Sequence, residues 1–209
     1  IMHETGHALY EQGLPKNIAF EPIGSFASMG IHESQSRLIE NHVGRSESFC
    51  NYIHNLLKKY FDKHSIPNKY ALFKIVNRVD KGFIRTEADE LTYDLHIMLR
   101  FELEEEHIEG QLNPKDLEES WNHRFLKDFG IPVPDSGRGV LQDIHWSLGA
   151  FGYFPTYTIG NIYAAALFQK VISDYPQVMD QMEKGNIELI KDWLKSNIYS
   201  HGKKMGANN

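Results

Sequence analysis

The chain has 209 residues, of which 41% are hydrophobic, so it can build a buried core within one large domain or two small ones. Its formal net charge is −6, no basic cluster marks a nucleic-acid partner, and no apolar run approaches the roughly 20 residues that span a bilayer. The one cysteine, Cys50, excludes an intrachain disulfide, and the chain does not open with a signal-peptide pattern, so composition favours a soluble cytoplasmic protein.

Apolar residues at spacings of three and four along most of the chain predict an all-α, predominantly helical fold. We expect helices over residues 3–12, 33–62, 67–79, 88–108, 113–130, 157–173 and 186–197. The helix over 113–130 has the clearest signals, because Asn113 stands as N-cap, Pro114 takes the first helical position and Gly130 closes the last turn. We interpret residues 1–209 as a single helical domain.

Two segments depart from the helical pattern. Residues 13–31 carry glycines and prolines around the stretch SFASM, which predicts at most a short β-segment near residues 24–30, bordered by turns. Residues 130–155 mix glycines and prolines with aromatic side chains. Loops of this length inside a compact domain are usually functional or disordered, and the aromatic content argues against disorder.

The first candidate site lies in the stretch HETGH near the start of the chain. His3 and His7 are four residues apart, so on a helix both imidazoles can reach one metal ion. Glu4 is placed to hold and deprotonate a water molecule activated by that metal, which is the HExxH arrangement of zinc peptidases. The alternative is a solvated helix that carries two histidines by chance.

A catalytic zinc also needs a third protein ligand and an open fourth position. Position 13 is Gly13, which excludes the metzincin pattern with its third histidine there. Glu33 follows His3 by 30 residues at the start of a predicted helix and is the best candidate, with His32 as the competing ligand. On spacing alone the rival carboxylates are Glu11, Glu21 and Glu40. The alternative role of Glu33 is that of a first-turn glutamate that favours the helix dipole.

Four stretches in chain order carry a resemblance to a known family: HETGHALYEQGL, GIHESQSRLIENHVGRS, FIRTEADELTYDLHIMLRFELE and GVLQDIHWSLGAFGYFPTYTIGN. Together they resemble the thermostable metallocarboxypeptidases of the carboxypeptidase Taq type over residues 2 to about 165. The resemblance implies a zinc- or cobalt-dependent, zincin-like enzyme that removes C-terminal amino acids from peptides with broad specificity. It also implies His3, His7 and Glu33 as metal ligands and Glu4 as general base.

Arg85 matches the I-R-x-x-A-D element of that family. A carboxypeptidase must recognise a free C-terminal carboxylate, and a guanidinium can bind one through two parallel hydrogen bonds. Arg85 is therefore a candidate substrate-binding residue, with Arg78 as a weaker rival. The alternative is that Arg85 forms a structural ion pair with Glu87, Asp89 or Glu90.

The aromatic loop offers hydrogen-bond donors for the oxyanion of a tetrahedral intermediate. The resemblance favours His145 and Tyr153, since a phenol can donate to an anion that develops beside the metal. Tyr157 is held in reserve and is grouped with Arg85 in substrate binding. The alternative for these aromatic residues is packing. His96 lies on the apolar face of its predicted helix, and we expect it to be a core histidine with satisfied hydrogen bonds.

Members of that family are well over twice as long as this chain, and their H-P-F and D-x-R-x-T motifs upstream of HExxH are absent from it. The resemblance thus implies that residues 1–209 are the C-terminal catalytic portion of a longer metallocarboxypeptidase, a homodimer at full length, without its N-terminal half. We expect the 209-residue chain alone to bind metal weakly and to be far less active than a full-length enzyme. The alternatives are a zinc oligopeptidase or dipeptidase of the same HExxH-Glu group, and a non-enzymatic helical module.

Overall fold

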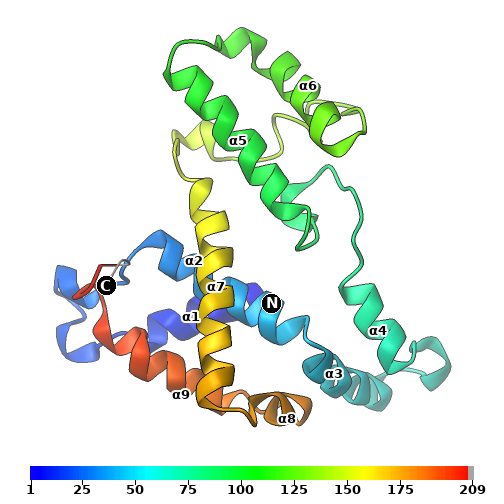
Figure 1. Cartoon of the computed structure of the whole chain (residues 1–209), viewed down its shortest axis with the longest axis vertical. Helices are drawn as coiled ribbons and strands as arrows, with labels where there is room; N and C mark the ends of the chain where they lie inside the picture. Colours follow the sequence, from blue (N-terminus) through cyan, green and yellow to red (C-terminus); the bar gives the residue numbers. More distant parts are fainter. Residues whose placement is uncertain (207–209) are drawn as a thin grey trace. The chain divides into compact units, whose positions relative to one another are not determined.

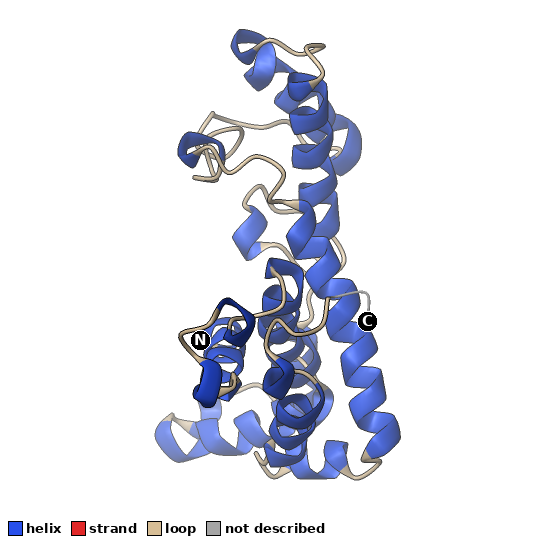
Figure 2. Cartoon of the chain, turned by 90° about the vertical axis from the view of Figure 1, so that its left-hand side faces the viewer, coloured by secondary structure: helices blue, strands red, loops and turns tan. Residues whose placement is uncertain are grey.

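The computed structural model describes residues 1–206, with the backbone alone at residue 63. Across these described residues every regular element is helical and no strand occurs (Figure 2). The all-α prediction is confirmed. Near residues 24–30 the backbone is extended at Ser25 and Ser28, but neither residue belongs to a strand. Among the helices of this part of the chain, none combines the length and the apolar character needed to cross a membrane.

The chain divides into two compact units, each with its own hydrophobic core. The first comprises residues Ile1–Asn77 together with the chain from Ile159 onward, and the second comprises Arg78–Thr158. That residues 1–209 act as a single domain stays a prediction.

The first unit is built from helices (Figure 1), most of which contribute side chains to one apolar cluster. Its α-helices are α1 (Met2–Gly13), α2 (Met29–Arg37), α3 (Glu47–Tyr60), α4 (Lys69–Val76), most of α7 (Pro155–Asp174), α8 (Val178–Glu183) and α9 (Glu188–Asn197). A π-helical segment, Leu38–Gly44, follows α2, and 3-10 turns cover Lys16–Ile18, Pro22–Gly24, Lys63–Ser65 and Tyr199–His201. Helix α1 packs on α2, and α3 packs on α4 and α8. Tyr10 of α1 and Leu38 are completely buried in the cluster.

The predicted helix over residues 33–62 is wrong in its start and in its continuity. The observed helix begins earlier because the Ser28 hydroxyl accepts a hydrogen bond from the backbone N–H of Ile31, at 3.2 Å. The helix ends after the π-helical segment. A new helix, α3, then begins, and the Ser46 hydroxyl caps it by accepting a hydrogen bond from the backbone N–H of Phe49 at 3.1 Å. The sequence reading also missed the short helix α8.

The second unit contains α5 (Tyr93–Ile108) and α6 (Leu117–Phe129), which pack side by side (Figure 1). Its 3-10 turns are Arg85–Glu87, Pro114–Asp116 and Trp146–Leu148. Helix α5 begins later than predicted because the Asp89 carboxylate accepts hydrogen bonds from the backbone N–H groups of Leu91 and Thr92, both at 2.9 Å. Gly130 ends α6 with φ of 71°, as its position in the sequence predicted.

His96 of α5 is completely buried against the rings of Phe125 and Phe129. Its predicted place in the core is confirmed, but the prediction of satisfied hydrogen bonds is wrong, because neither ring nitrogen has a partner. Burial, assisted by the positive charge of Arg100, lowers the pKa of His96 to about 3. The imidazole is therefore neutral across the physiological range.

Candidate metal centre

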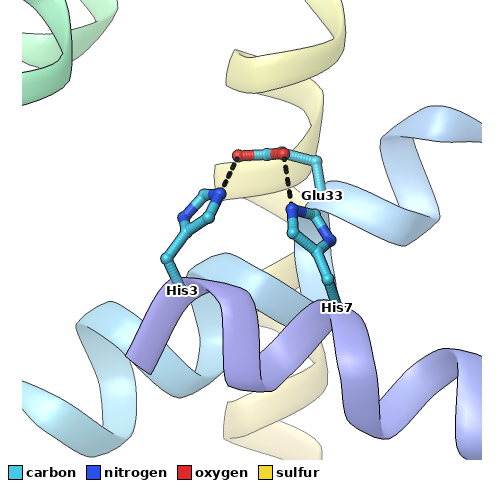
Figure 3. Close-up of side chains that lie close together, drawn as sticks. All are labelled: His3, His7 and Glu33. Atoms are coloured by element: carbon cyan, nitrogen blue, oxygen red, sulfur yellow. Dashed lines mark ion pairs between the residues drawn. The ribbon is translucent and has the colours of Figure 1, made fainter. Parts of the chain in front are cut away.

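Helices α1 and α2 bring two imidazoles and one carboxylate to a common point. His3 and His7 stand on one face of α1, and each turns its Nε2 toward a different oxygen of Glu33 (Figure 3). The distances are 3.7 Å from His3 Nε2 to Glu33 Oε1 and 3.5 Å from His7 Nε2 to Glu33 Oε2. These are the three residues that the sequence reading selected as ligands.

Two glycines allow this close approach of the helices. Gly6 lies between the two histidines, and a Cβ added there would lie 2.2 Å from the carbonyl oxygen of Gln35 in α2. A Cβ added at Gly160 of α7 would lie 2.7 Å from Cγ of Glu33. Any larger side chain at either position would push the Glu33 helix away from its neighbour. The close packing of α1 on α2 thus explains why position 6 in HETGH is a glycine.

The donor set fits a divalent metal ion. The donor atoms of His3, His7 and Glu33 all lie within 4.8 Å of one another. Ligands at about 2.0–2.2 Å from one tetrahedral ion would lie roughly 3.3–3.6 Å apart, so small side-chain rotations would suffice to bind it. The two histidine side chains are 29% and 23% exposed, which leaves one side of the group open to a water molecule or a substrate. Two imidazoles and a carboxylate form the His₂Glu set of catalytic zinc sites.

A carboxylate supports His3 from behind. Nδ1 of His3 donates to Oε2 of Glu40 at 2.9 Å, which leaves Nε2 directed at Glu33. Burial alone would raise the pKa of Glu40, but the hydrogen bond from His3 and the charge of Arg37 outweigh burial and hold that pKa below its ordinary value. Arg37 also donates from Nε to Oε1 of Glu33 at 3.1 Å, so both carboxylates that face α1 are held in place by hydrogen bonds.

A different partner supports His7. Its Nδ1 lies 2.7 Å from Nδ1 of His32, and Nε2 of His32 donates to Oε1 of Glu11 at 2.8 Å. Burial lowers the pKa of His7 against the opposing charge of Glu33, which favours the neutral imidazole that a metal requires. Of the rival ligands, His32 and Glu40 therefore contact the histidines of the donor set from behind, and Glu11 lies behind His32. Glu21 is exposed.

Glu4 follows His3 on α1 and is exposed to solvent. Its negative charge acts on His7, where it opposes the lowering of the pKa, although it is the weakest of the contributing causes. The structure thus places an accessible carboxylate on the helix that carries both imidazoles, as a general base would require.

In the second unit Arg85 is 6% exposed and is held by hydrogen bonds on each of its three side-chain nitrogens. Nε and Nη2 donate to Asp143 at 3.1 and 2.7 Å, and Nη1 donates to the Tyr93 hydroxyl at 2.8 Å. The backbone N–H of Arg85 donates to Oε1 of Gln142 at 2.8 Å. The structural partner is thus Asp143, and not one of the three acidic residues near Arg85 that the sequence suggested.

Asp143 also accepts a hydrogen bond from Nε of Arg100 at 2.7 Å, so one carboxylate serves two guanidinium groups. Burial would raise the pKa of Asp143, but the hydrogen bond from Arg85 and the charge of Arg100 hold it below its ordinary value. Burial lowers the pKa of Arg100 to about 10 against the attraction of Asp143. All three groups are therefore charged at neutral pH, and the cluster carries a net positive charge.

The three remaining predicted site residues lie together in the second unit. Nε2 of His145 is 2.9 Å from the Tyr157 hydroxyl, and the ring of Tyr153 lies 5.4 Å from His145 and 5.5 Å from Tyr157. The guanidinium of Arg85 lies 4.6 Å from the centre of the Tyr157 ring, a cation–π contact. Burial lowers the pKa of His145 against the charge of Asp143, so a neutral imidazole is favoured.

Several residues of these clusters had no role in the sequence reading. Asp143 and Gln142 stand in the quoted motif GVLQDIHW, so the motif itself was the signal that could have found them. Arg100 and Glu104 sit on the buried side of α5, where Glu104 accepts from Nε1 of Trp146 at 2.7 Å. The signal for these two residues was a charged side chain at an apolar position of the helix. Such a residue points to a buried partner, because buried charges are almost always paired.

Three comparisons place the chain among known proteins. Residues 1–209 match the family model described as carboxypeptidase Taq (M32) metallopeptidase. Thermostable carboxypeptidase 1 of Thermus thermophilus is 43% identical over 201 residues, which are 96% of this chain and 39% of that protein. Thermostable carboxypeptidase 1 of Pyrococcus furiosus is 43% identical over 204 residues, 96% of this chain and 40% of that protein. An M32 carboxypeptidase structure from Deinococcus radiodurans is 38% identical with a TM-score of 0.93, covering 99% of this chain and 42% of that one. The chain thus spans about two fifths of the length of these relatives.

Proposed function

The chain belongs to the carboxypeptidase Taq (M32) family of metallopeptidases, and from this premise we propose that it supplies the metal centre of a broad-specificity, metal-dependent carboxypeptidase. The observation that carries the proposal is the convergence of His3 Nε2 and His7 Nε2 on the two oxygens of Glu33, at 3.7 and 3.5 Å. The substrates would be peptides with a free C-terminal carboxylate. A homodimer and a cytoplasmic location stay predictions.

In this proposal His3, His7 and Glu33 hold Zn²⁺, with Co²⁺ as the alternative ion. When bound, such a metal polarises the scissile carbonyl and lowers the pKa of a water molecule at the open position. The hydrogen bonds from His3 to Glu40 and from Arg37 to Glu33 support this assignment, because they hold the ligands in the orientation that a cation needs.

Glu4 would act as general base. It removes a proton from the attacking water and then delivers that proton to the leaving amine. Its exposure supports the role, because an exposed carboxylate is accessible to water and to a substrate.

The roles proposed for the second unit are oxyanion donation by His145 or Tyr153 and substrate binding by Arg85 and Tyr157. The contact between His145 and Tyr157 supports a polar cluster able to donate hydrogen bonds. The contacts of Arg85 favour a second role, in which its guanidinium orders the loop that carries Gln142 and Asp143. Arg85→Lys separates the two: a raised KM for free-carboxylate peptides with unchanged thermal stability supports substrate binding, whereas a lowered melting temperature supports loop ordering.

The experiment loads the 209-residue chain with Zn²⁺ or Co²⁺ and measures bound metal and peptide hydrolysis. A blocked dipeptide with a free C-terminal carboxylate is compared with its C-terminal amide. We expect the chain to bind one metal weakly and to hydrolyse the free-carboxylate peptide alone, at a rate far below that of a full-length family member. Glu4→Gln should keep the metal and lose about 10²–10⁴-fold in rate, whereas the exposed Glu21→Gln should change neither.

Other results would favour the alternatives. Equal hydrolysis of the amide would favour an oligopeptidase or dipeptidase of the same metal group. A chain that binds no metal would favour a non-enzymatic helical module and would contradict the proposal. Full activity in Glu4→Gln would contradict the role of Glu4 alone.

A further inference from the structure

The two histidines of the metal centre are supported differently. His3 is backed directly by a carboxylate, Glu40, at 2.9 Å. His7 is backed by a second imidazole, His32, at 2.7 Å, and the carboxylate of Glu11 stands behind that imidazole at 2.8 Å. His32 is adjacent in sequence to the ligand Glu33, yet it is not one of the three residues whose donor atoms converge.

Metal binding fixes the direction of every hydrogen bond in this chain of groups. If Nε2 of His7 binds a cation, it carries no proton, so the proton of the neutral ring lies on Nδ1. Nδ1 of His7 then donates, and Nδ1 of His32 must accept. The remaining proton of His32 lies on Nε2, where Glu11 accepts it. One assignment therefore satisfies all three side chains.

The surroundings of His32 hold its ring in this orientation. The ring packs edge-on against Phe26 with centroids 5.0 Å apart and tilted against Tyr10 at 5.4 Å. The side chain of His32 is 13% exposed, whereas that of Glu11 is 50% exposed. Tyr10 is itself fixed, since its hydroxyl accepts from the backbone N–H of Ala27 at 3.1 Å. The acceptor nitrogen of His32 is thus placed by packing as well as by Glu11.

We infer that His32 is a positioning residue of the metal centre: it accepts the Nδ1 proton of His7, Glu11 holds it in place, and the pair presents Nε2 of His7 to the ion. The inference rests on the proposed metal centre. Partners behind ligating histidines orient the ring, and their loss typically weakens metal affinity by about 10–100-fold.

Two substitutions separate positioning from packing. His32→Phe keeps a ring against Phe26 and Tyr10 but removes the acceptor, whereas His32→Asn loses the ring and keeps an oxygen near the place of Nδ1. Zn²⁺ affinity of the full chain is measured by competition with a chromophoric chelator, and the melting temperature of the metal-free chain is measured in parallel. We expect His32→Phe to weaken Zn²⁺ binding about 10–100-fold and His32→Asn to recover part of that loss. The metal-free His32→Asn chain should nevertheless melt at a lower temperature than His32→Phe, because it has lost the ring.

Glu11→Gln tests the carboxylate that stands behind His32. Glu21→Gln is its control at another exposed position of the same unit. We expect Glu11→Gln to weaken Zn²⁺ binding less than His32→Phe does, because an amide oxygen still accepts from Nε2 of His32. Glu21→Gln should leave the affinity unchanged.

The outcomes distinguish the inference from the function on which it rests. A wild-type chain without stoichiometric Zn²⁺ contradicts the proposed metal centre itself. A wild-type chain that binds one Zn²⁺, with His32→Phe equally tight or with His32→Asn weaker than His32→Phe, contradicts positioning alone. A loss in His32→Phe as large as that in His7→Ala, with no recovery in His32→Asn, would make His32 a direct ligand and would also contradict the inference.

Discussion

The polar groups of the two units serve different purposes. In the first unit the imidazoles of His3 and His7 remain partly exposed and direct their free nitrogens at Glu33, so the group can be completed by a cation. In the second unit Asp143 is shared by two buried guanidinium groups, and its carboxylate oxygens are occupied. A polar cluster that is open at its centre indicates a binding site, whereas a cluster whose carboxylate is already occupied by its own hydrogen bonds mainly maintains the structure around it.

The largest effect is expected from Asp143→Asn. This change leaves Arg85 and Arg100 buried without their counter-charge, which should lower the free energy of unfolding by about 3–5 kcal/mol. Denaturant unfolding measures the loss. Asp135→Asn is the matched control, because it removes the partner of Arg138 from an exposed ion pair and should destabilise the chain far less. Equal effects of the two substitutions would mean that the buried cluster does not have the structural role assigned to it.

Gly6→Ala should act on the open cluster. The added methyl would overlap the carbonyl of Gln35 and separate α1 from α2, at a cost of about 1–3 kcal/mol in the free energy of unfolding. Because the ligands lie on these two helices, Zn²⁺ affinity should fall by more than about tenfold as well. Calorimetry and chelator competition measure the two effects.

Gly82→Ala is the control for this change, since a Cβ there would meet no atom within 4 Å. It should leave both quantities near their wild-type values. Unchanged metal affinity in Gly6→Ala would contradict the claim that the proposed metal centre depends on the close approach of α1 and α2.

The smallest effect at neutral pH concerns His96, whose neutral ring has two buried nitrogens without partners. Its pKa of about 3 in the folded chain lies below its ordinary value of 6.5. Between these values the unfolded chain binds a proton that the folded chain does not, so stability falls as the pH is lowered from 6.5 toward 3. His96 should contribute about 1.4 kcal/mol per pH unit to this fall.

His96→Leu removes both the titration and the unsatisfied nitrogens. We expect it to raise the free energy of unfolding at pH 7 by about 1 kcal/mol and to flatten its pH dependence between pH 6 and 4. Unfolding curves at several pH values measure both, with His123→Leu as the same substitution at an exposed position of α6. A steeper pH dependence in His96→Leu would contradict the assigned direction.

The sequence predicted the helical class and the family, and both are confirmed. It also selected His3, His7 and Glu33, because spacing defines one face of a helix and the family motif named the third residue. Spacing alone left Glu40 and Glu11 as rivals, since the crossing of α1 over α2 is set by contacts between residues distant in sequence, such as Gly6 with Gln35.

Other features depend on tertiary contacts that periodicity does not carry. The π-helical segment Leu38–Gly44 has no local signature, and the pairing of Arg85 with Asp143 joins residues 58 positions apart. The caps Ser28 and Ser46 are different, because a serine before an apolar helix is a readable signal and would have corrected the predicted helix boundaries.

The central claim is that two histidines and one glutamate of this chain hold a divalent metal. Zinc X-ray absorption fine structure of the loaded 209-residue chain tests it directly. We predict two imidazole nitrogens, contributed by His3 and His7, together with oxygen ligands, all at about 2.0–2.2 Å, and loss of the bound zinc in Glu33→Ala. Three imidazoles around the zinc, or a Glu33→Ala chain that keeps the wild-type spectrum, would contradict it.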